Sequence, residues 1–323
     1  MKRSFDFTLE GRRFFPIFIG FWIPFLIIEV VLVSRNMRLQ GGSAGFAEAV
    51  PSLLASLGLF LLSVLFQIPF MRRLVPAVTF EGTPFGFRGS IGRYFGINLL
   101  GLFLSVITAG IYYPWFMARI TRYLAGETSY KEQALSFVGK GGRLFAIVLL
   151  TLLIPVIVIA AASALAGMRW GDLSYVSYSP AQVLLLILVG LILLAFLSAY
   201  VYGVYRWVFT NLRYGGHEVR WKTDFWSAVA YVWVQLLLSI ITVGIYGPAA
   251  YVRLYRYFVN RTVVDREEQL FGGLSFEGRV GKGFGLLWGQ GLLCLITAGI
   301  YIPWAIARVG KWFLSNTSFT EGA

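Results

Sequence analysis

Long apolar runs alternate with polar connectors along the chain. Four runs are long enough to cross a bilayer as helices, because a hydrocarbon core about 30 Å thick needs ~20 helical residues. They are Phe14–Val33, Pro51–Phe70, Leu144–Ala166 and Val183–Val208. One connector joins the first two runs and another joins the last two. The pattern therefore predicts two long helical hairpins that span a membrane.

A short motif occurs three times outside these runs. The octapeptide T-A-G-I-Y-Y-P-W at Thr108–Trp115 returns as T-A-G-I-Y-I-P-W at Thr297–Trp304 and, more loosely, as T-V-G-I-Y-G-P-A at Thr242–Ala249. An aromatic residue stands 21 positions before each motif threonine, and basic residues follow it by 11 and 14 positions. Constant spacing over three copies indicates tandem repeats. Weaker leading patterns at Phe5–Phe7 and Leu135–Gly139 open the two long hairpins.

The repeat units have two lengths. From the leading aromatic to the final basic residue, the units that begin at Phe7 and Phe137 run 66 and 69 residues, to Arg73 and Arg206, and the other three run 35 each. Thirty-five helical residues extend ~52 Å in total. After the turn and the flanks are subtracted, each arm keeps about 12–15 residues, too few for the core. We expect three short, re-entrant hairpins whose turns lie inside or just beneath the outer leaflet.

Two other arrangements of the short units stay open. In one, the first arm spans the membrane and the arginine-bearing second arm lies on the far surface as an amphipathic helix. In the other, the chain makes ten thin but complete crossings. The ten-crossing arrangement differs from the re-entrant one only in depth, and hydropathy does not separate these two.

The expected fold is an all-α polytopic membrane protein, with residues 1–323 in one membrane domain. The long hairpins are 5–80 and 135–214, and the short ones are 85–130, 219–264 and 274–319. Aromatic and polar residues alternate around turn residues in the connectors, which predicts short cytoplasmic β-hairpins between the helices. The clearest are Val78–Phe80 with Phe85–Phe87 and Leu212–Tyr214 with Val219–Trp221.

Composition and charge support a membrane protein and orient it. The chain is 58% hydrophobic and 13% charged, whereas soluble domains carry roughly a quarter charged residues, so soluble, secreted and disordered classes are excluded. Only Arg35, Arg38 and Arg169, 3 of the 28 basic residues, lie in the connectors of the long hairpins. By the positive-inside rule the opposite side is the cytoplasm, and both termini lie there. The net charge of +13 is thus a topology signal and needs no nucleic acid.

The motif residues suggest a turn and, beside it, a binding site. Gly110, Gly244 and Gly299 can end a helix in the left-handed conformation, and Pro114, Pro248 and Pro303 suit the first turn of the next helix. Tyr112, Tyr246 and Tyr301 fit an interface belt or line a substrate path. The arginines at +11 either extend to lipid phosphates or converge as an anion-binding ring; they are Arg119, Arg253 and Arg308.

Glu29 is the acidic residue deepest in an apolar run. A carboxylate inside a membrane is a candidate proton relay or arginine partner. Its position four residues from the end of the run equally allows exposure at the outer surface.

Catalytic and metal-binding patterns are missing from the sequence. One histidine (His217) and one cysteine (Cys294) cannot form a disulfide or a Cys/His metal site. The sequence also lacks the G-x-S-x-G, H-E-x-x-H and phosphate-loop motifs. We therefore expect no enzyme, no catalytic residues, no metal and no cofactor.

Together, these motifs resemble a known family. The F-x-F-x-G start, the T-x-G-I-Y-x-P-W turn, the R-x-x-[RK]-[YW] end and the trailing strands Glu127–Tyr130 and Asn316–Phe319 are similar to those of the bacterial YjgN-like inner-membrane proteins, a family with a domain of unknown function. The resemblance covers nearly the whole chain and is strongest over Phe85–Tyr130 and Val219–Phe319. It departs at Ala249, which replaces the tryptophan, and in the long hairpins, which lack the turn motif. It implies the bacterial cytoplasmic membrane and brings no activity.

Two function classes follow. The first is a transporter or pore for a small anionic solute, in which the three arginines hold the anion, Glu29 couples protons and the motif tyrosines line the path. The second is a non-transporting module that binds anionic lipid headgroups or a protein partner through its basic cytoplasmic face. The lipid bilayer is the expected partner in both, and a homo-oligomer is compatible with either.

Overall fold

The computed structural model describes residues 2–39, 46–165, 180–266 and 269–322. Arg169, in the second long connector, lies outside these residues. The helices are α1 (Gly11–Leu39), α2 (Phe46–Ala77), α3 (Ile91–Ile107), α4 (Tyr113–Gly126), α5 (Gly141–Val148), the π-helical turn η1 (Leu149–Leu153), α6 (Ile154–Leu165), α7 (Pro180–Phe209), α8 (Phe225–Ile241), α9 (Gly247–Val259), α10 (Val280–Ile296) and α11 (Ile302–Ser315). Four segments are long and apolar enough to cross a membrane, and these are Gly11–Arg35, Val50–Ala77, Gly141–Ala160 and Val183–Phe209.

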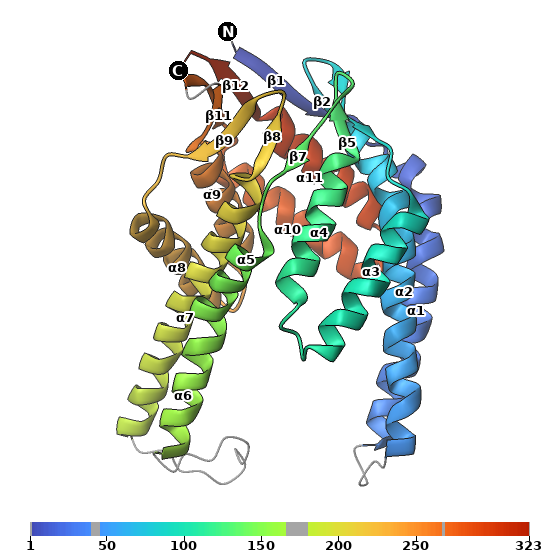
Figure 1. The fold of residues 1–323 in the computed structure, drawn as a ribbon, viewed down its shortest axis with the longest axis vertical. Helices are drawn as coiled ribbons and strands as arrows, with labels where there is room; N and C mark the ends of the chain where they lie inside the picture. The colour runs from blue at the N-terminus through green and yellow to red at the C-terminus, as the bar shows by residue number, and fades with distance from the viewer. Residues whose placement is uncertain (1, 40–45, 166–179, 267–268, 323) are drawn as a thin grey trace.

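Short strands connect the helices and gather at one end of the molecule, where both termini lie (Figure 1). They are β1 (Lys2–Phe7), β2 (Val78–Phe80), β3 (Thr83–Pro84), β4 (Gly86–Phe87), β5 (Thr128–Tyr130), β6 (Gln133–Ala134), β7 (Ser136–Phe137), β8 (Leu212–Tyr214), β9 (His217–Trp221), β10 (Thr262–Arg266), β11 (Gln269–Phe276) and β12 (Thr317–Glu321). Nine form one antiparallel sheet in the order β3-β2-β1-β12-β11-β10-β9-β8-β7, and β4-β5-β6 form a second sheet. We call the two sheets together the crown.

The crown shows that the expected all-α fold is wrong. The predicted hairpin of Leu212–Tyr214 with Val219–Trp221 is present as β8 with β9. The other predicted hairpin is wrong, because Val78–Phe80 pairs with β3 while Gly86–Phe87 pairs with β5. The connectors also pair with connectors far away in the sequence, because β1 hydrogen-bonds to β12 at the other end of the chain, with Lys2 opposite Thr320. Strands of two to eight residues cannot satisfy their backbone donors and acceptors alone. Neighbouring connectors pair for this reason, and a local pattern cannot indicate such long-range pairing.

The helices form a closed ring beneath the crown. The second arm of each hairpin packs against the first arm of the next: α2 on α3, α4 on α5, α7 on α8 and α9 on α10. The last arm, α11, packs against α1 and β1, so the order returns to its start. Figure 1 shows the two long hairpins reaching farther from the crown than the short hairpin α3–α4 between them. The ring places five hairpins side by side around a common interior.

A glycine follows each of three leading phenylalanines by two positions, just before the first helix of a hairpin, and leaves room for the phenylalanine ring. The phenylalanine ring folds back over the glycine two residues later, where an added Cβ would lie 2.3–2.6 Å from the ring. An arginine of the preceding second arm donates to the carbonyl of the same glycine at 2.8–3.1 Å. The sets are Arg72 with Phe87 and Gly89, Arg122 with Phe137 and Gly139, and Arg256 with Phe276 and Gly278. This contact gives the F-x-G pattern a physical reason.

The hairpin α10–α11 lies against α1, which shows how far a short hairpin extends. An added Cβ on Gly11, the first residue of α1, would lie 2.8 Å from the ring of Trp304 near the start of α11. At the tip of the hairpin, the Trp22 indole donates to the Ala298 carbonyl at 2.9 Å. The tip therefore lies within reach of the side chain of Trp22, eleven residues into α1.

Candidate functional site

The three motif turns share one backbone conformation. Each first arm ends at the motif threonine, and the next two residues both have positive φ: Ala109 and Gly110 at 48° and 88°, Val243 and Gly244 at 49° and 83°, and Ala298 and Gly299 at 47° and 84°. The glycine N–H then donates to a carbonyl five residues earlier, at 2.7 Å in all three, as in a Schellman cap. The glycines thus lie where the sequence suggested, but each turn uses two left-handed residues.

The motif threonine has a role that the sequence reasoning missed. Thr108 Oγ1 donates to the Leu104 carbonyl at 2.8 Å and accepts the Tyr112 N–H at 3.0 Å. Thr242 and Thr297 make the same two contacts, with Tyr246 and Tyr301. One hydroxyl therefore joins the two arms across the tip. The signal was present, because a threonine begins every copy of the motif.

The prolines and tryptophans fix the second arm. Pro114, Pro248 and Pro303 lie in the first turn of their helices. Trp115 stacks with Tyr112 at a ring distance of 6.4 Å and Trp304 with Tyr301 at 5.8 Å. Each tryptophan also covers the first residue of the next hairpin, Gly141 or Gly11, where an added Cβ would lie 2.7–2.8 Å away. The aromatic part of the motif thus joins neighbouring hairpins.

The +11 arginines are exposed and do not meet one another. The guanidinium of Arg253 donates to the Tyr246 hydroxyl at 2.7 Å, and that of Arg308 lies 5.9 Å from the Tyr301 ring centre. Within the described part of the chain, no hydrogen bond or ion pair joins Arg119, Arg253 and Arg308. The contacts of Arg253 and Arg308 stay inside their own hairpins. The structure does not bring the proposed anion-binding ring together.

The arginines 14 positions after the motif threonines, Arg122 and Arg256, join neighbouring hairpins of the ring. Arg122 and Arg256 bind the glycine carbonyl of the following hairpin, as described above. In the first long hairpin Arg72 makes this contact. In the structure, Arg72 is therefore the residue equivalent to Arg122 and Arg256, whereas the sequence analysis used Arg73, one position later, to measure the length of this unit.

Gln235 extends the Arg253 contact into the hairpin. Its side chain is buried in α8, and its Oε1 accepts the Tyr246 hydroxyl at 2.7 Å. Gln290 occupies the same register in α10, also buried, and its Oε1 has no hydrogen-bond partner. The sequence analysis did not single out either glutamine.

Glu29 lies in α1, on a long hairpin, whereas the arginines lie on the second arms of short hairpins. Its side chain is half-buried, and no salt bridge joins it to another described residue. The structure therefore does not unite Glu29 with the arginines in one site.

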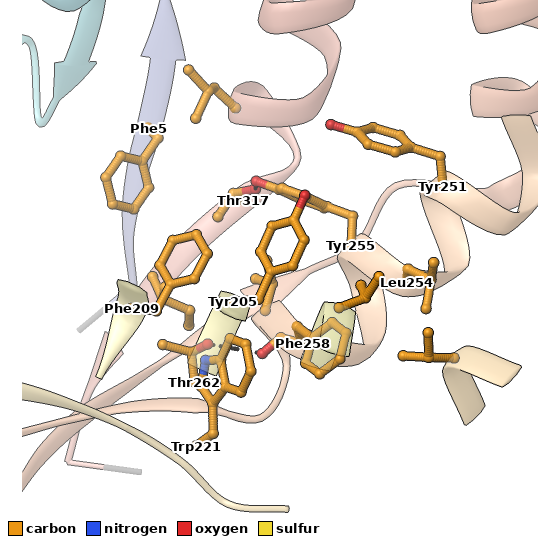
Figure 2. Close-up of a pocket in the computed structure, with 15 residues that line it drawn as sticks. Phe5, Tyr205, Phe209, Trp221, Tyr251, Leu254, Tyr255, Phe258, Thr262 and Thr317 are labelled. Carbon is orange, nitrogen blue, oxygen red and sulfur yellow. Dashed lines mark hydrogen bonds between the residues drawn. The ribbon is translucent and has the colours of Figure 1, made fainter. Parts of the chain in front are cut away.

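A cavity of about 460 Å³ lies inside the ring, on its crown side (Figure 2). Helices α7, α8, α9 and α11 and strands β1, β9, β10, β11 and β12 supply its walls, so units from both ends of the chain line it. The lining is aromatic and aliphatic and contains no charged side chain. Its residues are Phe5, Val201, Tyr205, Phe209, Trp221, Val232, Tyr251, Leu254, Tyr255, Phe258, Val259, Thr262, Leu274, Leu314 and Thr317.

Hydroxyl groups gather at one part of this cavity. The Tyr255 hydroxyl lies 3.0 Å from Thr317 Oγ1, and Figure 2 shows the Tyr205 hydroxyl turned toward the same side. Phe209, Trp221 and Phe258 line the other side with aromatic rings, and the Trp221 indole nitrogen is the one polar side-chain atom of these three residues. The arrangement suits an uncharged molecule that has an apolar face and a few hydrogen-bonding groups.

Arg253 faces away from this cavity. In α9, Tyr251, Leu254, Tyr255 and Phe258 line the cavity, and their spacing places them on one helical face. Arg253 lies two residues from Tyr251, about 200° around a helix with 3.6 residues per turn. It therefore points to the outside of the ring, where lipid surrounds a membrane protein.

The described residues contain no group of three or more His, Cys, Asp or Glu side chains that could hold a metal ion. The described part of the chain thus offers an uncharged cavity on one face of α9 and the exposed Arg253 on the other.

Comparisons with known proteins place the chain in a family. A family described as "Bacterial protein of unknown function (DUF898)" matches residues 2–272 and 271–323. The chain is 38% identical over 71 residues to the inner membrane protein YjgN of Salmonella typhimurium, which is 22% of this chain and 18% of that protein. It is 32% identical over 75 residues to the inner membrane protein YjgN of Escherichia coli K12, 23% and 19% of the two chains. No solved structure matches.

The matched segments thus span less than a fifth of the curated relatives' length. The four apolar helices and the names of these relatives support a bacterial inner-membrane location. The resemblance to YjgN-like proteins is confirmed. The chain is an integral membrane protein and belongs to the bacterial family of unknown function DUF898.

Proposed function

We propose that this protein moves a small solute across the inner membrane along the interior of its hairpin ring. The observation that carries the proposal is the closed order of hairpins around an uncharged, aromatic cavity. Membrane transporters commonly bind their solute between internal repeats, and here hairpins from both halves of the chain line the cavity.

The depth of the short hairpins supports a re-entrant arrangement. The tip of α10–α11 contacts the side chain of Trp22, eleven residues from Gly11, so it lies no deeper than ~16 Å along a helix. That is about half of the ~30 Å core. Irregular backbone at such depth needs partners, and the threonine hydroxyl provides one at each tip.

The orientation follows from charge. Both chain ends belong to the crown, in β1 and β12, and 25 of the 28 basic residues lie on the crown side of the long hairpins. The positive-inside rule then favours a cytoplasmic crown.

The cavity favours a different solute from the one that the arginine spacing predicted. A small anion would find no cationic side chain in the cavity lining, and leaving its charge unpaired there is costly. An uncharged solute with an apolar face and hydroxyl groups fits both sides of the cavity. We therefore assign the solute to this class and not to small anions.

The proposal can be tested by uptake of radiolabelled phenyl glucoside, with inorganic phosphate as the anionic alternative, into proteoliposomes. Leu254→Trp fills the cavity and should reduce phenyl glucoside uptake at least tenfold. Ile240→Trp, on an exposed position of the same hairpin, is the matched control and should leave uptake unchanged. Equal uptake by both variants, or uptake of phosphate alone, would contradict the assignment.

The outward arginines support a second candidate, binding of anionic lipid. Arg119, Arg253 and Arg308 occupy one register on the second arms and, on the outside of the ring, can reach lipid phosphates. The triple change to glutamate should release fluorescent phosphatidylglycerol from the protein in nanodiscs while phenyl glucoside uptake persists. If uptake of phosphate exists and is lost in this variant, the arginines belong to the transport path after all.

A further inference from the structure

Six aromatic rings of the crown form a closed circuit. Starting at Phe80, consecutive ring centres lie 5.8, 5.8, 6.4, 4.7, 5.7 and 6.4 Å apart before the circuit returns to its start. All six spacings are within the range of favourable aromatic pairs. The members, in order, are Phe80, Tyr130, Tyr214, His217, Phe271 and Phe319. We call this set the aromatic girdle.

The girdle connects strands from all around the crown. Its members lie on β2, β5, β8, β9, β11 and β12, so it includes both sheets. Tyr130 bridges the two sheets, because its hydroxyl donates to the Phe80 carbonyl at 3.1 Å and its own carbonyl accepts the Tyr214 hydroxyl at 2.9 Å. Five of the rings come from the nine-stranded sheet, and Tyr130 comes from the second sheet. The girdle therefore lies where the two sheets of the crown meet.

Phe5 links the girdle to the cavity. Its ring lies 4.6 Å from the ring of Phe80, and it also lines the cavity. The girdle is thus continuous with the crown end of the cavity wall. His217 is its one ionisable member besides the tyrosines, and its Nδ1 is bonded to the Tyr214 carbonyl at 3.0 Å.

We infer that the aromatic girdle is the gate that closes the crown end of the cavity and decides which solutes pass there. The class of solute that passes the gate rests on the proposed function, whereas the seal against water and ions does not. A narrow apolar constriction keeps out water and ions because they would lose their hydration. Passage requires the rings to turn aside, which an uncharged solute with an apolar face can compensate by stacking on them. The girdle therefore excludes ions, as the uncharged lining of the cavity next to it does.

The test measures access to the cavity and not transport. A cysteine at Leu254, in a Cys294→Ser background, reports on the cavity, and a membrane-impermeant maleimide is added to inside-out and right-side-out vesicles. With the girdle intact, labelling from either side should be slow. The double change Phe271→Ala and Phe319→Ala should raise labelling from the crown side at least tenfold.

Phe85→Ala is the matched control. Phe85 stacks on Tyr130 at 5.0 Å but lies outside the circuit, so its loss should leave labelling slow. Because Phe319 is buried and its loss could unfold the protein, His217→Ala with Phe271→Ala provides a second opening of the circuit at half-buried positions. The inference is overturned if Leu254→Cys reacts rapidly with the girdle intact, or if the control raises labelling as much as the girdle variants. Faster labelling without any solute uptake would retain the seal and remove the transport proposal.

Discussion

Two kinds of junction join the hairpins of the ring, and their difference explains part of the motif. At the junctions α4–α5 and α11–α1, the motif tryptophan covers a glycine that begins the next helix, Trp115 on Gly141 and Trp304 on Gly11. At the junction α9–α10 the same two registers hold Ala249 and Val280. A small residue replaces the tryptophan where a larger one replaces the glycine.

This exchange indicates that the motif tryptophan packs neighbouring hairpins of the ring together. A solute-binding tryptophan would have no reason to vanish together with a glycine of the neighbouring helix. A packing tryptophan would, because interiors are close-packed and conserve volume. The departure at Ala249, which set one repeat apart from the family pattern, thus has a local explanation.

The largest effect is expected from filling the glycine site. In Gly141→Val, the added Cβ would lie 2.7 Å from the Trp115 Cα as well as from its ring, and backbone cannot rotate away. We expect a loss of about 3 kcal/mol or more, the upper range for overpacked cores. Thermal unfolding in detergent, followed by tryptophan fluorescence, measures it. Gly142→Val is the control, because an added Cβ at Gly142 meets nothing within 4 Å.

Truncating the tryptophan should cost slightly less and should reveal the pairing. Trp115→Ala leaves a cavity, for which about 3–5 kcal/mol is typical in a water-surrounded core; near lipid we expect the lower end. If the two residues form one packing unit, Trp115→Ala combined with Gly141→Val will be more stable than the sum of the single changes implies. Strict additivity in the same unfolding assay would show that the two sites are independent and would weaken the junction comparison.

At the crown end of the junction α4–α5, the contact of Arg122 with the next hairpin should also contribute to stability. Arg122→Lys removes the planar group that donates to the Phe137 and Gly139 carbonyls, and a hydrogen bond from a charged group contributes roughly 1.5–3 kcal/mol. Arg73→Lys should have little effect, since Arg72 and not Arg73 makes the corresponding contact. Equal shifts in melting temperature for both variants would mean that charge alone matters there.

The threonine bridge should contribute less. Thr108→Val keeps the shape of the side chain but leaves the Tyr112 N–H without its acceptor, and an unmet buried donor costs about 1–3 kcal/mol. The tip is partly exposed, so we expect about 1 kcal/mol. Hydrogen exchange at Tyr112, by mass spectrometry, should become faster than at Tyr246 and Tyr301, which keep their threonines.

These contacts also show how far the sequence could lead. Hydrophobic runs and a three-fold motif were enough to predict the helices and the turns, because both depend on residues close in sequence. The crown and the ring depend on pairs such as Lys2 with Thr320 and Gly11 with Trp304, which lie at opposite ends of the chain. No local periodicity encodes such pairs, and the all-α expectation failed for that reason.

The prediction that three arginines form one anion site had a different weakness. Equal spacing placed Arg119, Arg253 and Arg308 on equivalent positions, but equivalent positions in a ring of hairpins converge only if they face inward, and spacing does not show which way they face. The outward direction became visible only once Tyr251 and Tyr255 marked the inner face of α9. The aromatic girdle had a partial sequence signal, because Tyr130 and Phe319 end the two trailing strands of the repeat, but its contacts with His217 and Phe271 join separate strands and have no local pattern.

The smallest predicted effect concerns how helices begin at the crown. Asp224 caps α8, and its Oδ2 accepts the Ser227 N–H at 2.8 Å, whereas the residues before α3, α5 and α10 (Ser90, Lys140 and Arg279) make no side-chain cap. The hydrogen bonds from Ser227 lower the pKa of the Asp224 carboxyl. A lowered pKa means that the cap stabilises the folded state above the carboxyl's ordinary pKa and is lost as the pH falls through the folded-state value. Asp224→Ala should therefore lower the melting temperature slightly at pH 7, and the difference from wild type should shrink on acidification below pH ~4. A difference that is independent of pH would show that the carboxylate charge does not contribute and that only the shape of this cap distinguishes α8 from its neighbours.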